Sequence, residues 1–492
     1  VKDVFNYPVL QDMAFYMESL NIQIDQAAVE GHVPLTPVQQ EFFAYGHRDP
    51  HHYNLAVMLL VSDGFPEAAL EEICLTLQNH HDALRIAYKE DKGKAVQYNH
   101  DTNYPVYAQV VRLGDQSDVQ QDIAAKTAQM QESLDLENGP LMKVVLFKHG
   151  SGDRLFIVIH HLVMDAISWK ILIEDLDELV SQFKANESLQ LPEKTHSYQY
   201  WARKLQAYAH EAEVLEQQGF WKKYVESVSP FIKKSRHEGP DLLHDSNDLT
   251  YALQKPTTQL LISKANVPFN TNSEELLLAA LVLATQDAFE AKHMAVMMES
   301  HGRDHPIEGV HLERTIGWFT CEYPVVFDTS RELELHQLIK HVKETLRKIP
   351  NGGIGYGLLQ YTDPVYALEA SKTKRPQVLF NYVGDMGSFL EQVSFEQAAE
   401  PVGFLRSQKG DREYDFEIIC AIIDQKLTAT LNYNPHYFET DTIVKWWEGY
   451  ASALERVVNY CAERHNQELT PSDLGYKDLS VEELDEIKDL FD

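Results

Sequence analysis

The sequence predicts an α/β protein built from two domains of similar size. Its 492 residues are more than one hydrophobic core usually organises. Segments with the apolar spacing of helices alternate with short β-branched segments in both halves of the chain. A composition of 44% hydrophobic and 24% charged residues is typical of a globular protein in water.

The charge and the cysteines indicate the setting of the protein. A formal net charge of −32 argues against nucleic acid and anionic membranes as partners. The four cysteines show no CxxC spacing, which suits free thiols in a reducing compartment. The beginning of the chain lacks a signal-peptide pattern, and the longest apolar run, LLLAALVLA (276–284), is too short to cross a bilayer. We therefore expect a cytoplasmic protein.

Changes in composition suggest how the chain is divided. A polar stretch, KANESLQLPEKTHS (184–197), separates the two halves, and the tail LSVEELDEIKDLFD (479–492) reads as an acidic helix. This tail either docks on the body or on another chain, or forms a loosely packed end. The expected divisions are an amphipathic helix over 1–20, a linker over 21–32, an N-terminal lobe over 33–190, a C-terminal lobe over 191–470 and a tail over 471–492.

The first half alternates predicted strands and helices. Strands are expected at AVMLLV (56–61), VVLFK (144–148) and LFIVIH (155–160), and the GSGD turn favours a hairpin of the last two. A helix is expected over 65–88, where proline stands in the first turn.

The second half continues the alternation. A capped and largely buried helix is expected over 270–291, followed by a strand, HMAVMMES (293–300), near whose end Glu299 lies. Further strand segments are expected in TIGWFTCEYPVVF (315–327), VLFNYVGDM (378–386) and LTATLNYNP (427–435).

Two adjacent histidines, His160 and His161, stand where a predicted strand runs into a helix. Apolar residues at helical spacing follow them, and Asp165 or Ser168 can cap that helix. Neighbouring side chains of an extended chain point to opposite faces, so one histidine should turn inward and the other outward. Histidine exchanges protons near neutral pH, which makes the pair a candidate catalytic base. The residues alone slightly favour the other interpretation, a structural pair, and Asp165 could orient an imidazole or pair with a cation.

Other site types find little support in the sequence. His51-His52 and His80-His81 are also adjacent pairs, but neither HExxH nor a Cys/His ligand spacing occurs, so no metal site is predicted. NGGIGYG (351–357) follows a helical segment, whereas a dinucleotide loop needs a strand before it.

Several stretches together resemble one family. HHLVMDAISW (160–169) matches the HHxxxD signature of the condensation-domain superfamily of nonribosomal peptide synthetases, and its Ser-Trp extension resembles the epimerization branch. Ala166 departs from the glycine of many relatives, and little effect is expected because alanine favours a helix start. Residues 1–20 resemble the last helix of a carrier protein, without its GGxS phosphopantetheine site. The other motifs match in the family's order: PLTPVQQEFF (34–43), ESHGRD (299–304), TIGWFTCEYP (315–324), PNGGIGYG (350–357) and FNYVGD (380–385).

The resemblance implies a fold and a reaction. The fold would be two chloramphenicol-acetyltransferase-like lobes arranged as a V, with the active site at their interface. The reaction would invert the Cα of an aminoacyl or peptidyl thioester from L to D, through loss of the α-proton and its return. The chain itself would bind no cofactor or metal, because the phosphopantetheine arm belongs to an upstream carrier protein. An adenylation domain of the same synthetase is an implied partner, and the acidic tail could contact a downstream synthetase.

The resemblance also implies residue roles. His161 and Glu299 would exchange the proton, since burial raises the pKa of a glutamate toward neutrality. Tyr382 would donate a hydrogen bond to the enolate or fill space in a strand. Asp165 would pair with Arg85 in a buried ion pair that holds the histidine loop. The expected supporting roles are loop support for His160, helix capping for Ser168, packing for Trp169, and either an arm contact or a strand turn for Asn381.

Two other functions compete with epimerization. A condensing enzyme would join two carrier-bound substrates, but such relatives typically lack both Glu299 in ESHGRD and the Ser-Trp extension. A non-catalytic recruitment platform would usually carry a degraded histidine motif, and here the motif is intact.

Overall fold

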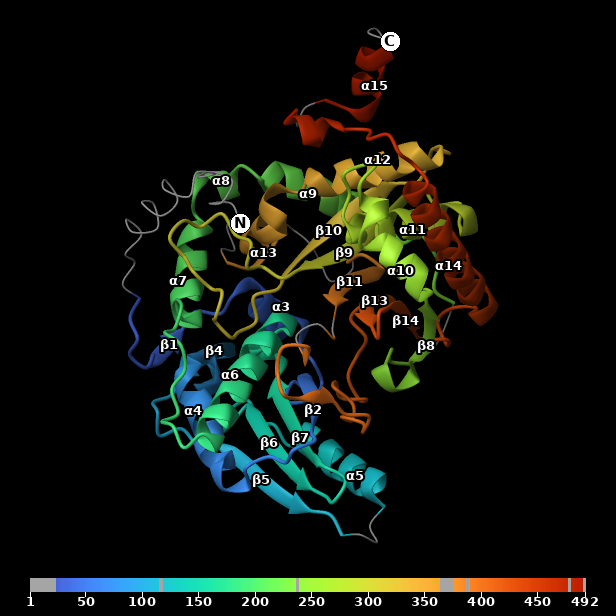
Figure 1. Cartoon of the computed structure of the whole chain (residues 1–492). Coiled ribbons are helices and arrows are strands. Elements are labelled where there is room, and N and C mark those ends of the chain that lie inside the picture. Colours follow the sequence, from blue (N-terminus) through green and yellow to red (C-terminus); the bar gives the residue numbers. More distant parts are fainter. Residues whose placement is uncertain are drawn as a thin grey trace, which may run out of the picture.

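The protein, described here from a computed structural model, is an α/β molecule of two lobes (Figure 1). The structure describes residues 24–114, 118–235, 239–362, 375–385, 387, 390–476 and 479–489. The predicted helix over residues 1–20 lies outside these ranges.

The first lobe is built on a five-stranded sheet in the order β12-β2-β7-β6-β5. The predicted hairpin is confirmed, with Val145 opposite Phe156 in antiparallel register. Alternate side chains of its strands point to opposite faces, so α4 and α6 cover one face and α5 covers the other (Figure 1). The bounds are β2 Asn54–Val61, β5 Tyr107–Arg112, β6 Met142–Lys148, β7 Asp153–His160, β12 Glu396–Gln397, α4 Leu70–His80, α5 Val119–Gln131 and α6 Ala166–Lys184.

The helix predicted over 65–88 is shorter than expected. After α4 the chain makes a 3₁₀ turn at Asp82–Arg85 and continues as the strand β3 (Ile86–Asp91). This strand pairs with β4 (Lys94–Asn99) in a small three-stranded sheet with β1 (Gly31–Val33). The helical spacing of apolar residues does not reveal this change, because β3 is formed by a hairpin in which Lys92 and Gly93, both with positive φ, turn the chain back as β4.

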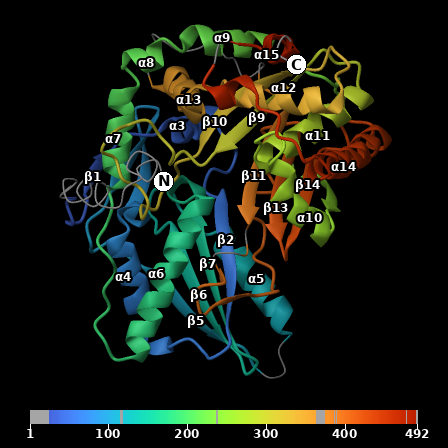
Figure 2. The same ribbon diagram turned by 45° about the horizontal axis from the view of Figure 1, so that its top comes forward.

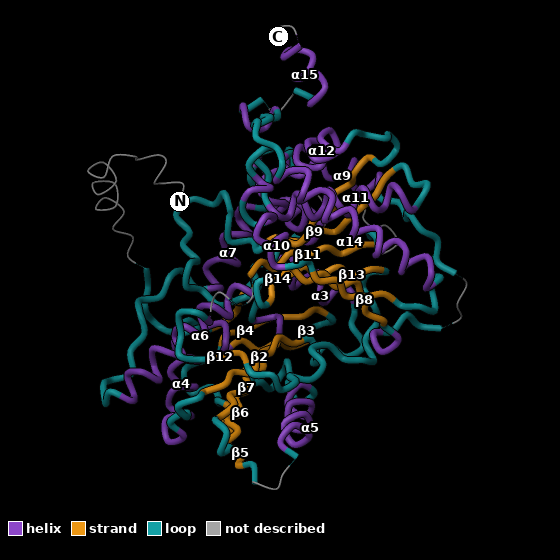
Figure 3. The backbone as a smooth tube through the Cα atoms, turned by 45° about the vertical axis from the view of Figure 1, so that its right-hand side comes forward, coloured by secondary structure: helices purple, strands orange, loops and turns teal. Residues whose placement is uncertain are grey.

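The second lobe contains a six-stranded sheet in the order β10-β9-β11-β13-β14-β8, largely antiparallel, with β11 parallel to both its neighbours. Helices α11 and α14 cover one face, as the colouring by secondary structure makes visible (Figure 3). Phe416 and Ile418 face them and are buried, whereas Ile419 and Ile423 point away and are about half exposed. The bounds are β8 Asn247–Ala252, β9 His293–Ser300, β10 Cys321–Asp328, β11 Val378–Asp385, β13 Phe416–Ile423, β14 Lys426–Tyr433, α11 Ser273–Ala288 and α14 Thr440–Ala462.

One segment from the second half of the sequence crosses to the first lobe. Strand β12 pairs with the edge of β2, and Arg154 of β7 holds Glu400 at 2.7 Å. Farther along, Arg406 forms an isolated bridge with Tyr53. This crossover, 396–406, ties the two lobes together beside the histidine loop.

The acidic tail forms a helix, α15 (Val481–Asp489), beside α12 (Leu335–Arg347) (Figure 2). Leu484 is buried, and Lys340 of α12 lies 3.5 Å from Asp485. In this structure the tail therefore docks on the body of the protein. No helix in the described ranges has the length and apolarity required to cross a membrane.

Candidate active site

The two adjacent histidines have different surroundings. His160 ends β7 and is fully buried; its Nε2 lies 2.9 Å from the carbonyl of Pro50, and its Nδ1 accepts a hydrogen bond from the Leu162 amide. Burial lowers the pKa of His160 to about 3. Both ring nitrogens therefore contact backbone groups, and the ring is neutral near pH 7; loop support by His160 stays the prediction that the resemblance gives.

His161 is less buried than His160. Its ring packs 4.5 Å from that of Trp318 and 5.7 Å from that of Tyr53, centroid to centroid. Its Nδ1 is buried and turned toward the protein interior. Burial lowers the pKa of the imidazole, and the backbone at His161 and Met164 together with the negative charge of Asp165 opposes this shift. A neutral imidazole can accept a proton near neutral pH.

Asp165 and Ser168 hold the histidine loop against the second lobe. Asp165 is the N-cap of α6 and accepts from the Ser168 amide at 2.9 Å, so Asp165 rather than Ser168 caps the helix. The other Asp165 oxygen pairs with Arg303 at 2.6 Å, and the Ser168 hydroxyl accepts from the same guanidinium at 2.9 Å. Arg303 belongs to the ESHGRD stretch, so the two motifs are joined directly.

The expected pairing of Asp165 with Arg85 is wrong. Arg85 is fully buried and pairs with Asp82 at 2.6 Å, three residues away. Its guanidinium also donates to the carbonyls of Gln78 and Asn79. Arg85 therefore closes the end of α4, and a cation from the other lobe neutralises Asp165. The prediction selected an arginine of the first lobe, whereas the folded chain supplied one of the second lobe, 138 residues from Asp165.

Glu299 lies near the end of β9 beside the lobe interface. Asn381 of β11 donates a hydrogen bond to its carboxylate. Burial raises the pKa of Glu299 to about 7, and the negative charges of Glu417 and Glu413 add to the shift. A carboxyl group with this pKa can both give and take a proton near neutral pH.

A cavity of about 760 Å³ adjoins Glu299 between the lobes. The first lobe lines it with the start of α6, and the second with the start of α11 and the ends of β9 and β11. Asn381 and Tyr382 are among the lining residues, and burial raises the pKa of the Tyr382 phenol. Trp169 packs in the core next to this wall and is 7% exposed.

Tyr53 and Arg406 connect the surroundings of His161 with those of Glu299. The Tyr53 ring contacts His161, and the charge of Glu299 contributes to raising the pKa of the Tyr53 phenol, after burial as the main cause. The positive charge of Arg406 acts to lower the pKa of both His161 and Glu299, although burial and neighbouring glutamates outweigh it at Glu299. Arg406 is thus an electrostatic neighbour of both predicted proton-exchanging groups, and of these two groups Glu299 lines the cavity.

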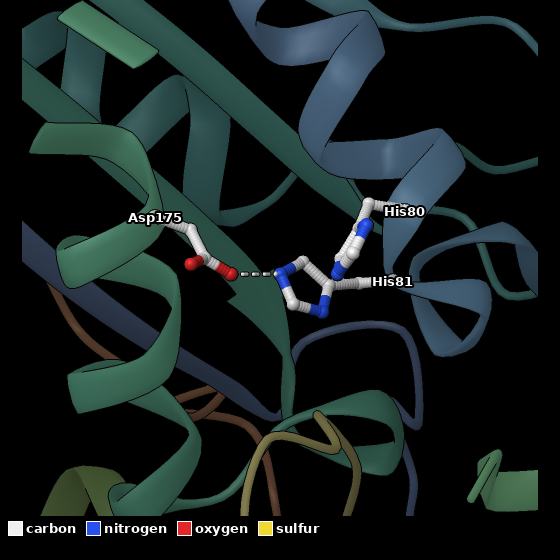
Figure 4. A group of neighbouring side chains, drawn as sticks. All are labelled: His80, His81 and Asp175. Atoms are coloured by element: carbon white, nitrogen blue, oxygen red, sulfur yellow. Dashed lines mark hydrogen bonds and ion pairs between the residues drawn. The ribbon is translucent and has the colours of Figure 1, made fainter. Parts of the chain in front are cut away.

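A group of side chains that could hold a metal ion lies away from this cavity (Figure 4). His80, His81 and Asp175 have ligand atoms within 4.8 Å of one another, and His81 Nε2 lies 2.9 Å from Asp175. Asp175 is already paired with Arg314, and the charges of Lys194 and Arg314 lower the pKa of His80 further below the value set by burial. The positive charges of Lys194 and Arg314 would repel a metal ion bound here. We therefore interpret this cluster as an ion-paired contact of α4 with α6.

Sequence reasoning missed three residues of the site. Arg303 stood inside a quoted motif, and its place four residues after Glu299 was the available signal. Glu322, the residue of β10 opposite Glu299 of β9, stands in the TIGWFTCEYP motif, but no sequence pattern connected it with Glu299. Arg406 lies in the crossover, which carries no motif.

The comparisons with known proteins agree on the family. The Condensation domain family matches residues 29–480. Bacitracin synthase 3 of Bacillus licheniformis is 35% identical over 493 residues, which cover 99% of this chain and 8% of that protein. Tyrocidine synthase 1 of Brevibacillus parabrevis is 34% identical over 500 residues, which cover 99% of this chain and 46% of that protein. The chain thus spans less than half the length of these relatives.

Solved structures show the same two-lobed fold. The crystal structure of the epimerization domain from the third module of tyrocidine synthetase B superposes with a TM-score of 0.83 at 34% identity, covering 90% of this chain and 99% of that chain. The X-domain from teicoplanin biosynthesis, at 18% identity and a TM-score of 0.68, shares the fold over 88% of this chain and 96% of that chain. The expected α/β architecture of two chloramphenicol-acetyltransferase-like lobes is confirmed, and the chain belongs to the condensation-domain family.

Proposed function

We propose that this chain epimerizes the Cα of an aminoacyl or peptidyl thioester from L to D. The substrate is carried on the phosphopantetheine arm of a carrier protein of the same synthetase. The observation that carries the proposal is Glu299, a buried carboxyl at the interlobe cavity whose pKa of about 7 suits proton exchange. The 34% identity to a solved epimerization domain supports the same reaction.

Inversion needs two proton-exchanging groups. One group removes the α-proton of the thioester, leaving a carbanion whose charge is delocalised onto the thioester oxygen. The other group then returns a proton to the opposite face of the carbon, which leaves the thioester intact with the opposite configuration. His161 offers an imidazole and Glu299 a carboxyl to which Asn381 donates a hydrogen bond. In this proposal Tyr382, which lines the cavity, donates a hydrogen bond to the enolate oxygen.

The proposal includes the setting of the enzyme. The chain uses no cofactor or metal of its own, because the thioester itself acidifies the α-proton. Its partners are the loaded carrier protein upstream, the adenylation domain that loads it and a downstream synthetase that accepts the D-product. The same proposal places the enzyme in the cytoplasm.

A single-carrier assay tests the reaction. The chain is mixed with one loaded carrier protein, without a second carrier, in deuterated water, and the chirality and deuterium content of the released amino acid are read separately. We expect inversion with label incorporation, and much less with the free amino acid, because docking of the arm supplies the positioning. Peptide formation only when a second carrier is added would instead show a condensing enzyme.

Variants assign the two groups. His161→Ala and Glu299→Gln should each reduce inversion by about 10²-fold or more, the usual effect of losing a general acid or base. A variant that still removes and returns the proton on one face should incorporate deuterium into one enantiomer without inverting it. Inversion at near wild-type rate in either variant would remove that residue from the mechanism.

A further inference from the structure

Glu322 of β10 lies directly opposite Glu299 of β9. The two residues are Cα partners in the antiparallel register of these strands. Side chains of directly opposed residues project from the same face of a sheet, with Cβ atoms about 4.5–5.5 Å apart. Like charges in this position repel each other, so the pair requires some compensation.

The neighbouring carboxylates each have a guanidinium partner. Glu41 of α3 (Pro37–Tyr45) pairs with Arg375, and Glu413 lies 3.7 Å from the same arginine. Glu417 of β13 pairs with Arg406 at 2.5 Å. Within the ranges that the structure describes, neither member of the Glu299–Glu322 pair forms an ion pair, and these neighbours add net negative charge around it.

Neutral groups donate hydrogen bonds to both members of the pair. Asn381 donates to Glu299, and the Tyr414 hydroxyl donates to Glu322 at 2.9 Å. Burial raises the pKa of Glu322 well above its usual range, and the negative charges of Glu41 and Glu299 raise it further. Arg406 and Arg375 act to lower the pKa of Glu299 and Glu322, respectively, but do not outweigh burial and the neighbouring carboxylates. Two opposed carboxyls that form no ion pair do not both ionise readily at neutral pH.

We propose that Glu322 is a positioning residue for Glu299: it stays protonated at the working pH and donates its proton as a hydrogen bond to the Glu299 carboxylate. This inference rests on the proposed function of Glu299. When Glu299 is ionised, the bond spreads its charge over both carboxyl groups. When Glu299 takes up the α-proton, both groups become neutral, and the proton count of Glu322 is unchanged throughout.

Two substitutions separate this role from simple packing. Glu322→Met removes the donor, so the ionised form of Glu299 loses its hydrogen bond, and we expect the pKa of Glu299 to rise by about one unit. Glu322→Gln restores an N–H donor of similar shape and should return the pKa to near the wild-type value. Asp328→Asn, which changes a carboxylate at the far end of the same strand, opposite His293, should leave it unchanged.

The pKa is measured without substrate by NMR titration of the ¹³C-labelled glutamate carboxyls, with Glu299→Gln and Glu322→Gln assigning the two signals. In the wild-type protein the Glu322 carboxyl should report the protonated form at pH 7.5. The pH profile of inversion should move in the same direction as the titration. Thermal unfolding of each variant shows whether it is folded.

Three results would overturn the proposal. The first is an ionised Glu322 in the wild-type protein at pH 7.5. The second is a pKa of Glu299 that falls by one unit or more in Glu322→Gln. The third is a pKa of Glu299 that stays at the wild-type value in a folded Glu322→Met protein. The titration needs no turnover, so its result does not depend on the outcome of the epimerization assay. Failure of inversion in the wild type would refute the proposed function while leaving the carboxyl pair tested.

Discussion

At the scale of single residues, neighbours in the sequence take different roles because the fold gives them different partners. Both ring nitrogens of His160 contact backbone groups, and the ring of His161 packs against Trp318 and Tyr53. The two residues differ in burial because β7 ends between them and the chain turns into a 3₁₀ helix. Residue type and spacing located the pair, and the turn decided which ring is the more exposed.

The raised pKa of Glu299 predicts a dependence of stability on pH. In the unfolded chain a glutamate titrates near about 4.3, whereas in the folded protein Glu299 titrates at about 7. Between these values the folded state binds more protons, so its free energy of unfolding falls as the pH rises through about 7. Glu299→Gln removes this contribution and should gain stability relative to wild type, by about 3 kcal/mol at most, between pH 5 and pH 8.

Urea unfolding of both proteins at several pH values measures this difference. Glu332→Gln, which changes an exposed glutamate, serves as the control and should follow the wild-type curve. Stability curves of wild type and Glu299→Gln that run parallel from pH 5 to pH 8 would contradict the assignment of a raised pKa to Glu299.

At the scale of elements, the start of α6 is fixed by contacts from both lobes. Asp165 caps the helix with one oxygen and binds Arg303 with the other. The Arg303 guanidinium also stacks on the Phe319 ring at 4.2 Å. The position of the histidine loop therefore depends on the second lobe as well as on the helix that follows it.

Breaking this ion pair should be costly. Asp165→Ala leaves Arg303 buried without its carboxylate and removes the helix cap, so we expect a loss of about 3–5 kcal/mol in the free energy of unfolding, together with loss of activity. Arg303→Met should cost less, because its hydrophobic side chain can keep the contact with Phe319. Denaturant unfolding of both single variants and the double variant gives the coupling energy, and a double variant whose loss equals the sum of the single losses would exclude the pair.

At the scale of the whole molecule, several contacts join the lobes in the described ranges, the Glu41–Arg375 pair among them. Two of these contacts lie beside the candidate site: the Asp165–Arg303 pair, and the crossover 396–406 with its strand β12 and the Arg154–Glu400 pair. The candidate site and its cavity lie between these contacts, so the relative placement of the lobes controls the distance across which a proton must be exchanged.

Weakening both contacts should uncouple the lobes. We expect wild type to unfold in one calorimetric transition, and Arg303→Met combined with Glu400→Gln to unfold in two, because each lobe retains its own sheet and core. Each single variant should keep one transition at a lower temperature. A single transition in the combined variant, with the calorimetric and van't Hoff enthalpies equal, would show that other contacts couple the lobes.

The sequence by itself determined the α/β class, most of the strands and long helices, and the motif that contains His161. These follow from side-chain periodicity and local turn chemistry, which depend on near neighbours. The residues around His161 and Glu299 came together only in the tertiary structure. Arg303 rather than Arg85 neutralises Asp165, and β10 places Glu322 opposite Glu299, because strand pairing and lobe contact join residues far apart in the chain. Such pairs have no characteristic separation in the sequence, because the partner of a buried charge is whichever residue the fold brings next to it.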